Sequence, residues 1–317
     1  MTDVLRIGSR GSKLALVQSE WVRDRLRELH PGLAVEIEVI HTKGDKILDA
    51  PLAMIGDKGL FTKELEAAIL ERRVDVAVHS AKDMPTETPE GLAIAVFTAR
   101  EDVRDVFVAR GGDGTPRGLV DLPAGAVVGT SSLRRRSQLL AARSDLEVVD
   151  IRGNVETRIR KVKDEGMAGT VLAAAGLARL GRADAAAFAF SFDEMLPAVG
   201  QGSLAIETRA GDGATRTLLL PLLHEPTAAA VCAERALMHA LEGGCQVPIA
   251  ALGEVVGAGG LRLRACVGSL DGTTVVRLER GGDAAAPEQL GRALADDLLA
   301  AGADRILREV RGEVGRG

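Results

Sequence analysis

Apolar segments of strand length alternate with segments of helical periodicity along the first two thirds of this chain. The predicted strands cover 4–8, 35–40 and 74–80 in a first series and, from near Asp105 onwards, 126–130, 146–151 and 170–176 in a second. Helical patterns separate them, with Ala15, Val22, Leu26 and Leu29 on one face of the first and Phe61, Leu65 and Ile69 on one face of the helix before 74–80. Ser12 is placed to cap the first helix, Ser131 or Ser132 the helix after 126–130, and Asn154 the helix after 146–151. Because alternating strands and helices are typical of α/β sheets, the sequence predicts two successive α/β units.

The pattern changes beyond His224. A helix over 226–242, short strands within 249–279 and a helix with leucines at helical spacing after 287 indicate a smaller α+β domain. The chain is predicted to cross between the first two units near 98–105 and to return within 196–202. The predicted domains are therefore 1–99 plus 200–220 for the first α/β domain, 103–196 for the second, and 224–317 for the α+β domain.

The composition narrows the possible partners. A net charge of −5 and an aromatic content of 2% argue against nucleic-acid binding. No apolar stretch is long enough to span a bilayer, and residues 1–20 lack a secretory pattern, so we expect a cytoplasmic protein without a membrane partner. The three cysteines include no C-x-x-C pair and predict neither disulfides nor a metal site. No long exposed apolar helix is evident, which favours a monomer.

Arginines collect at two loops that follow predicted strands. Segments 129–136 (GTSSLRRR) and 150–161 (DIRGNVETRIRK) each place arginines in the first turns of a helix, where each opposes the helix dipole by about 0.3–1 kcal/mol. One interpretation is that they point into water, as one of three consecutive arginines must. A bound anion would make the same arrangement favourable, because free backbone N–H groups and the guanidinium groups of arginine attract carboxylates and phosphates. We favour a ligand with several carboxylates, since the cations are spread over two loops and neither matches a nucleotide motif.

Two more loops carry charged residues at strand ends. HSAKD (79–83) would present Lys82 and Asp83 at the edge where α/β sheets bind ligands, although a surface ion pair or a cap explains them about as well. Arg10 and Ser12 form a loop of the same strand-to-helix kind, for which a plain N-cap beside a solvated arginine is the alternative.

Cys245 follows two glycines that read as a helix C-terminus with glycine in the left-handed cap. The negative end of a helix does not activate a thiol, and none of the five histidines shows the pattern that a thiol hydrolase needs. Cys232 and Cys266 read as buried fillers. Cys245 is thus expected to be exposed and to tether a ligand permanently.

Seven motifs, in order, resemble the porphobilinogen deaminase (hydroxymethylbilane synthase) family. They are IGSRGSKLAL, GDKGLFTKELE, VHSAKDMP, VGTSSLRRR, IRGNVETR, LPAVGQG and ERALMHALEGGCQVPI. The resemblance implies two domains like the lobes of type II periplasmic binding proteins and a third that carries a dipyrromethane cofactor, bound to Cys245 by a thioether, with no metal. It implies a transferase that condenses four porphobilinogens head to tail with loss of ammonia and then releases hydroxymethylbilane by hydrolysis, for tetrapyrrole (haem-type) biosynthesis.

The resemblance also implies roles for single residues. Asp83 would be the catalytic carboxylate, a buried anion that holds pyrrole N–H groups and stabilises the cationic azafulvene left by ammonia. The implied cofactor contacts are Lys82, Thr130, Ser131, Ser132, Arg134 and Arg135. The implied substrate contacts are Arg10, Ser12, Arg152, Arg158 and Arg179.

One position departs from the family pattern. Met54 stands where many members have a lysine, so no role is assigned to it, whereas Lys58 remains. The alternative function is a two-lobed polycarboxylate-binding module without catalysis, which the fold alone would allow. The combination of Cys245 and Asp83 argues against that alternative.

Overall fold

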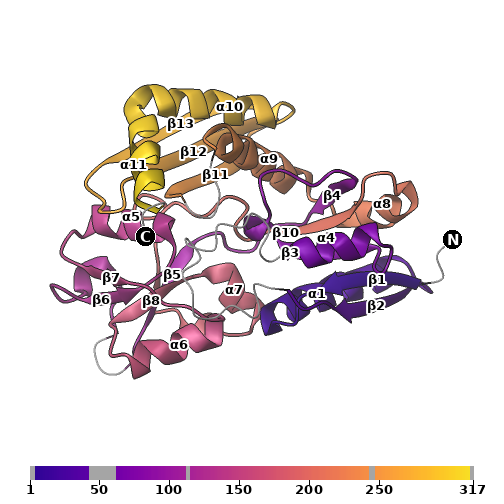
Figure 1. The fold of residues 1–317 in the computed structure, drawn as a ribbon, viewed down its shortest axis with the longest axis horizontal. Coiled ribbons are helices and arrows are strands. Elements are labelled where there is room, and N and C mark those ends of the chain that lie inside the picture. The colour runs from indigo at the N-terminus through magenta and orange to yellow at the C-terminus, as the bar shows by residue number, and fades with distance from the viewer. Residues whose placement is uncertain (1–3, 43–61, 112–114, 243–246, 315–317) are drawn as a thin grey trace.

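The computed structural model describes residues 4–42, 62–111, 115–242 and 247–314, and nothing is said below of the structure of the others. Within the described ranges the chain forms three sheets, which lie in three adjoining parts of the molecule (Figure 1). Two sheets have five strands and one has three.

The first sheet has the strand order β2-β1-β3-β10-β4. Its strands are β1 (Val4–Ser9), β2 (Ala34–Val39), β3 (Val76–Ser80), β4 (Leu92–Phe97) and β10 (Leu204–Arg209). Strand β1 is parallel to β2 and β3, whereas β10 is antiparallel to β3 and β4. The associated helices are α1 (Lys13–Leu29), α4 (Lys63–Leu70) and α8 (Gly213–Leu219).

The second sheet repeats this arrangement with the order β7-β6-β8-β5-β9. Its strands are β5 (Asp105–Ala109), β6 (Val127–Gly129), β7 (Glu147–Val149), β8 (Gly169–Ala173) and β9 (Phe188–Ala189). Strand β6 is parallel to β7 and β8, and β5 is antiparallel to β8 and β9. The associated helices are α5 (Leu133–Ala142), α6 (Val155–Asp164) and α7 (Ala174–Arg179).

In each five-stranded sheet, the strand at the fourth position follows a segment of the chain that crosses over from the other α/β unit. Strand β5 follows the first crossing of the chain, and β10 follows the return, so each sheet has four strands that run in one direction and one antiparallel crossing strand. Helices pack on both faces of the first sheet, with α1 in one apolar cluster and α4 in another. The predicted pair of α/β units and the predicted double crossing are therefore confirmed.

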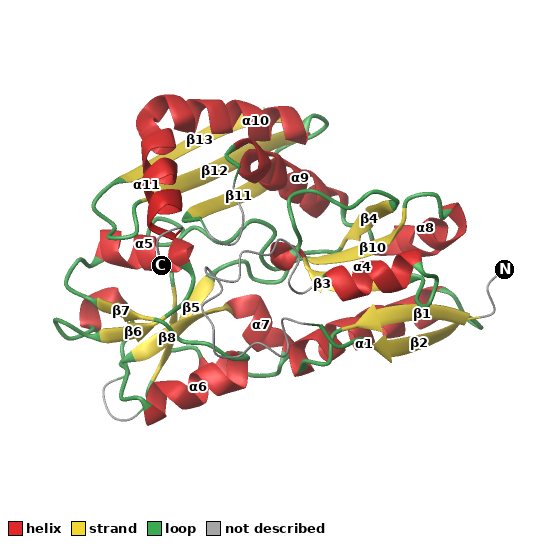
Figure 2. Cartoon of the chain, in the orientation of Figure 1, coloured by secondary structure: helices red, strands yellow, loops and turns green. Residues whose placement is uncertain are grey.

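The C-terminal part has one antiparallel sheet with helices on one face, as Figure 2 shows. Its strands are β11 (Ile249–Val256), β12 (Gly260–Gly268) and β13 (Val275–Asp283), and its helices are α9 (Glu225–Ala240), α10 (Pro287–Leu298) and α11 (Asp304–Val314). The opposite face of the sheet packs through Ala250, Leu252 and Cys266 against Leu196 of the return crossing. The predicted α+β character is confirmed, while the exact domain limits stay a prediction.

Several sequence predictions need correction in detail. The strand predicted over 170–176 ends at Ala173, because the following alanines and glycine belong to α7. Leu29, expected on the buried face of α1, is 37% exposed at the end of that helix. After α9, Glu242 has a left-handed backbone with φ of 50°, while Gly243 and Gly244, the glycines expected to form the cap, lie outside the described residues. Phe61, expected on a helix face, lies outside the described residues.

Candidate active site

The loops that follow β1 and β3 meet at one small hollow that is open to solvent. Arg10, Ser12, Gln18, His79, Ser80 and Asp83 are among its lining residues, and we call it the Asp83 hollow. The structure therefore brings together three residues that the sequence placed on two separate loops. Because β1 and β3 are adjacent and parallel, their carboxyl ends open on the same edge of the sheet.

Asp83 lies in a short 3-10 helix, η1 (Ala81–Asp83), directly after β3. Its side chain is exposed in the described structure, so the expectation of a buried anion is wrong. The physical reason is local: η1 turns Ala81 into the core and leaves Lys82 half-buried and Asp83 at the surface. Within the described ranges no hydrogen bond to another residue occupies Asp83, so it can accept hydrogen bonds from a ligand in the hollow.

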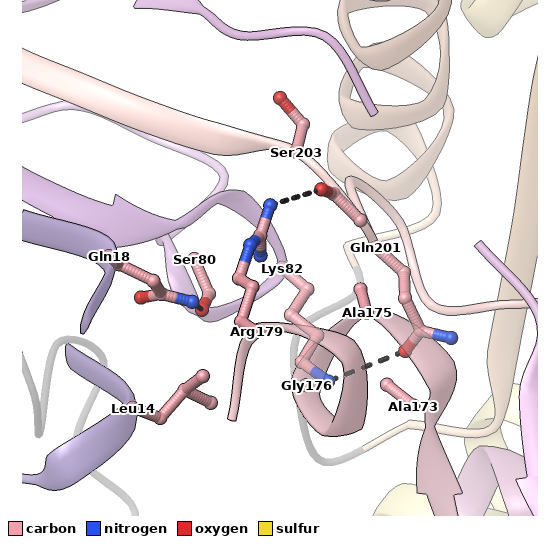
Figure 3. Close-up of a pocket in the computed structure, with 11 residues that line it drawn as sticks. Leu14, Gln18, Ser80, Lys82, Ala173, Ala175, Gly176, Arg179, Gln201 and Ser203 are labelled. Carbon is pink, nitrogen blue, oxygen red and sulfur yellow. Dashed lines mark hydrogen bonds between the residues drawn. The ribbon is translucent and has the colours of Figure 1, made fainter. Parts of the chain in front are cut away.

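Lys82 lines a second hollow together with Gln18, Ser80, Arg179 and Gln201 (Figure 3). Its Nζ donates to Gln201 Oε1 at 3.4 Å. Burial lowers the pKa of Lys82 to about 8, although the neighbouring Asp83 partly opposes the shift. Lys82 and Asp83 thus face two hollows that share Gln18 and Ser80, whose side chains are joined by a hydrogen bond of 2.9 Å.

Arg179 ends α7 and reaches the return crossing. Its Nη2 donates to the carbonyl oxygen of Gly202 at 2.6 Å (Figure 3), and burial lowers the pKa of this guanidinium. This contact holds the second α/β unit to the chain that re-enters the first. The side chain of Arg179 thus already joins the two α/β units. Its implied contact with the substrate stays a prediction.

The serines and threonine of the 129–136 loop are engaged with the protein. Ser132 caps α5, since its Oγ accepts from the N–H of Arg135, as predicted for this position. Ser131 Oγ donates to the carbonyl of Ile151 at 2.9 Å and accepts from the N–H of Ile151 at 3.2 Å, which joins the two arginine-bearing loops. Thr130 is buried, and its Oγ1 accepts from the N–H of Ser132. Their implied cofactor contacts stay predictions.

Arg134 and Arg135 are both buried and share one carboxylate. Each approaches Asp105 at 2.7 Å, Arg134 at Oδ2 and Arg135 at Oδ1. Burial alone would raise the pKa of Asp105, but the two guanidiniums outweigh burial and hold it below the ordinary value. Two cations against one carboxylate leave the group with an excess positive charge.

The interpretation that one of the three consecutive arginines points into water is wrong for Arg136. We expected at least one of them to point into water. Arg136 is instead half-buried and donates through Nη1 to the carbonyl of Val148 at 2.9 Å, so all three side chains have protein acceptors. Helix α5 lies against β7 closely enough for this contact, which the local sequence does not reveal.

Arg152 and Arg158 add positive charge beside this group. Asn154 caps α6 by accepting from the N–H of Thr157, as predicted, and Arg158 Nε donates to the Gly153 carbonyl at 2.8 Å. Burial, together with the neighbouring positive charges of Arg135 and Arg152, lowers the pKa of Arg158 to about 10. Arg152 Nη1 is buried and has no hydrogen-bond partner in the described part of the chain.

Two residues of this site were not identified from the sequence. Asp105 appeared only as the start of a strand, and Gln201 only as part of a crossing. Gln201 accepts from Lys82 and donates through Nε2 to Asp105 Oδ1 at 3.0 Å, so it connects the first loop to the arginine pair. Gln201 is the one amide in the predicted return crossing 196–202, whereas Asp105 is one of three acids in the first crossing 98–105, so the sequence offered a signal for Gln201 alone.

Cys245 and Met54 lie outside the described residues. Cys232 is half-buried on α9 and Cys266 is buried on β12, in agreement with the prediction that they fill the core. Over the described ranges, no group of three or more His, Cys, Asp or Glu is arranged to hold a metal ion. No helix there is both long and apolar enough to cross a membrane.

Family models match nearly the whole chain. Residues 5–217 match "Porphobilinogen deaminase, dipyromethane cofactor binding domain", and residues 228–300 match "Porphobilinogen deaminase, C-terminal domain". A porphobilinogen deaminase of Desulforudis audaxviator is 53% identical over 96% of this chain and 97% of its own length. One from Gloeobacter violaceus is 52% identical over 98% of this chain and 94% of its own.

Solved structures of two binding proteins are more distant. The periplasmic aliphatic sulphonate binding protein of Escherichia coli has a TM-score of 0.40 at 12% identity, covering 76% of this chain and 71% of its own. The substrate binding domain of a putative molybdenum transporter from Clostridium difficile has a TM-score of 0.43 at 10% identity, covering 70% and 93%. Likenesses this distant carry no argument about the ligand.

Proposed function

This chain belongs to the porphobilinogen deaminase family, and from that premise we propose how its two hollows perform the family's reaction. The activity is that of a hydroxymethylbilane synthase, a transferase that joins porphobilinogen units with loss of ammonia on a dipyrromethane cofactor. We assign the reaction to the carboxyl edge of the first sheet, where η1 presents Lys82 to one hollow and Asp83 to the other. The observation that carries this assignment is the meeting of one exposed carboxylate, Asp83, with a half-buried lysine and a group of partly unpaired arginines.

The residues present fit a cofactor and a product that carry two carboxylates on each ring. Arg135 Nε and Arg152 Nη1 are buried donors without a hydrogen-bond partner within the described ranges. Such donors are costly unless an anion accepts from them. The excess positive charge around Asp105 supports the same conclusion. We propose that Lys82, Arg134 and Arg135 face the cofactor carboxylates, and that Arg152 and Arg158 face those of the substrate and growing chain.

The protein's own groups divide the work in the following way. When bound, the dipyrromethane supplies the pyrrole carbon to which the first porphobilinogen is joined. Asp83 accepts hydrogen bonds from pyrrole N–H groups and stabilises the positive charge that develops on the substrate as ammonia leaves. Arg10 and the capped start of α1 at Ser12 lie across the same hollow and hold a substrate carboxylate.

The tether is tested by the mass of the intact protein. The purified chain should carry the added mass of two linked pyrrole rings, and Cys245→Ser should lose it. Cys232→Ser is the matched control, because this half-buried cysteine on α9 has no assigned role, and it should keep the added mass. A chain of unmodified mass that still converts porphobilinogen would overturn the assignment of Cys245.

The catalytic role is tested by ammonia release. Asp83→Asn keeps the size of the side chain, and because Asp83 is exposed the variant should fold normally. We expect turnover to fall by about 10²-fold or more, as for loss of a group that stabilises transition-state charge. Tight binding of porphobilinogen by the unaltered protein without ammonia release would instead support the binding-module alternative.

We further propose that the protein works as a monomer in the cytoplasm, without a nucleic-acid partner. The net charge of −5 supports the lack of a nucleic-acid partner. Sedimentation of the purified protein tests its oligomeric state, and a stable dimer at micromolar concentration would contradict it.

A further inference from the structure

A buried group of three titratable side chains lies directly behind the Asp83 hollow. His79 on β3, Glu207 on β10 and Glu66 on α4 are 5%, 0% and 7% exposed, and we call them the buried acid trio. His79 Nε2 lies 3.2 Å from Glu207 Oε2, and His79 also lines the hollow. The trio therefore connects the floor of the proposed reaction site to two carboxyls in the interior.

The sheet register produces this arrangement. His79 is paired with Ala205 across the antiparallel β3–β10 ladder, so Glu207, two residues further on, projects from the same face of the sheet. Helix α4 packs on that face and supplies Glu66. The polar trio sits between the apolar cluster under α4 and the one that contains Ala205 and Val231.

The trio is poorly explained as a device for stability alone. Oε1 of Glu66 and Oε1 of Glu207 are buried and find no hydrogen-bond partner in the described residues. Burial of two carboxyls with unpaired oxygens costs free energy that an apolar residue would avoid. Burial also raises the pKa of Glu66, and the nearby Glu207 raises it further. The group can therefore hold a proton that a solvated carboxylate would release.

Other charged groups surround the trio without neutralising it. Lys63 on α4 and His79 act on Glu66, and Arg235 on α9 acts on Glu207. The guanidinium of Arg235 is hydrogen-bonded to the carbonyls of Pro85 and Thr86, which follow η1. In front, Asp83 and Arg10 line the hollow.

We propose that the buried acid trio receives the proton that is lost each time a ring is added, with His79 as the group that faces the hollow. This inference rests on the proposed function. At each addition a carbon–carbon bond forms between the methylene carbon of the incoming unit and the free ring carbon of the chain end. The C–H bond at that ring carbon then breaks, its electron pair restores the aromatic ring, and the proton passes to the trio. The trio then gives this proton to water or to the ammonia released in the same cycle, so atoms and charges balance.

Glu66 and Glu207 act through His79 and are positioning residues, so their test needs a measurement that a merely structural role would not change. The substrate is porphobilinogen with deuterium on its unsubstituted ring carbon. Glu207→Gln should lower turnover by roughly 10²-fold, as for loss of general-base assistance. It should also raise the isotope effect from near unity to a full primary effect, because proton removal becomes the slow step. Glu254→Gln, which alters an ion-paired glutamate on β11, should change neither quantity.

A second measurement does not depend on activity. Because burial raises the pKa of Glu66 above its ordinary 4.5, the protonated carboxyl favours the fold, and that stability is lost as the pH rises through the folded-state value. Glu66→Gln does not lose stability in this way. The difference between its melting temperature and that of the unaltered protein should therefore move in favour of the variant as the pH is raised above 4.5. Glu254→Gln should show no such trend.

The outcomes separate this inference from the proposed function. If the unaltered protein releases no ammonia from porphobilinogen, the proposed function fails, whereas the melting experiment still reports whether Glu66 holds a proton. If ammonia release is normal and Glu207→Gln and His79→Gln show no rise in isotope effect, the trio does not receive the proton. A pH-independent stability difference for Glu66→Gln would overturn the proton-holding role itself.

Discussion

Glu234 is the residue whose loss should most weaken the connection between the three parts of the molecule. Its side chain on α9 is fully buried and accepts from Arg100 Nη1 at 2.8 Å and Nη2 at 2.6 Å. It also accepts from the backbone N–H of Gly200 and of Gly253, each at 2.7 Å. Arg100 precedes β5 in the first crossing, Gly200 belongs to the return crossing and Gly253 to β11, so one carboxylate joins both crossings to the C-terminal sheet.

The change Glu234→Gln keeps the shape of the side chain and removes its charge. Arg100 is only 12% exposed, so its charge would be left largely buried without a partner. Removing one member of a buried ion pair typically costs about 3–5 kcal/mol. The amide retains one acceptor oxygen but turns an N–H group towards donors, so we expect the loss to fall in that range.

Urea unfolding followed by circular dichroism measures this loss. The matched control is Glu156→Gln, which removes the same charge from an exposed pair, Lys13 to Glu156 at 2.6 Å, and should cost less than about 1 kcal/mol. If Glu234→Gln and Glu156→Gln destabilise the protein equally, burial does not determine the strength of these pairs, and the reasoning is refuted. The double variant Arg100→Met with Glu234→Gln should recover part of the loss, since no unpaired buried charge remains.

Three further predictions follow from single contacts. Gly291→Ala in α10 would place a Cβ 2.2 Å from a backbone carbonyl of α9 and should cost about 1–3 kcal/mol in thermal unfolding, whereas Gly312→Ala in α11, with open space around it, should gain about 0.5–1 kcal/mol. Because burial lowers the pKa of Lys82 to about 8, its charge is lost as the pH rises through that value, so the fraction of protein that takes up the dipyrromethane, measured by intact mass, should fall there, and Lys82→Arg should abolish the fall. Arg152→Ala should raise KM by roughly 10- to 100-fold, since a hydrogen bond to a charged group contributes about 1.5–3 kcal/mol, while Arg160→Ala on the exposed face of α6 should leave KM unchanged.

Local features of the fold were predictable because the chain segments involved are close in sequence. Ser12, Ser132 and Asn154 each cap a helix by accepting from an N–H three residues ahead, a contact that needs no other part of the molecule. The strand ends that carry Arg10 and Asp83 were predicted for the same reason, from apolar segments that stop at polar loops.

Contacts between distant segments could not be read in this way. The acceptor of Arg134 and Arg135 is Asp105, about 30 residues away, and it is reached only because β5 crosses from the other unit to lie beside β8. The expectation that Asp83 is buried was wrong because exposure depends on how η1 leaves the sheet. Gln201 lies on the return crossing. The sequence predicted the path of this crossing but not the contacts that its side chains make.

By itself the sequence determined the alternation of strands and helices, the helix caps, the polar loops at the strand ends and the family to which the motifs belong. Only the tertiary structure decided which charges are buried and which are paired. His79 and Glu207 are about 130 residues apart and meet because β3 pairs antiparallel with the crossing strand β10, and α4 removes them from water. Desolvation and ion pairing arise from neighbours that the fold supplies, so the charge state of a buried group is a property of the folded chain.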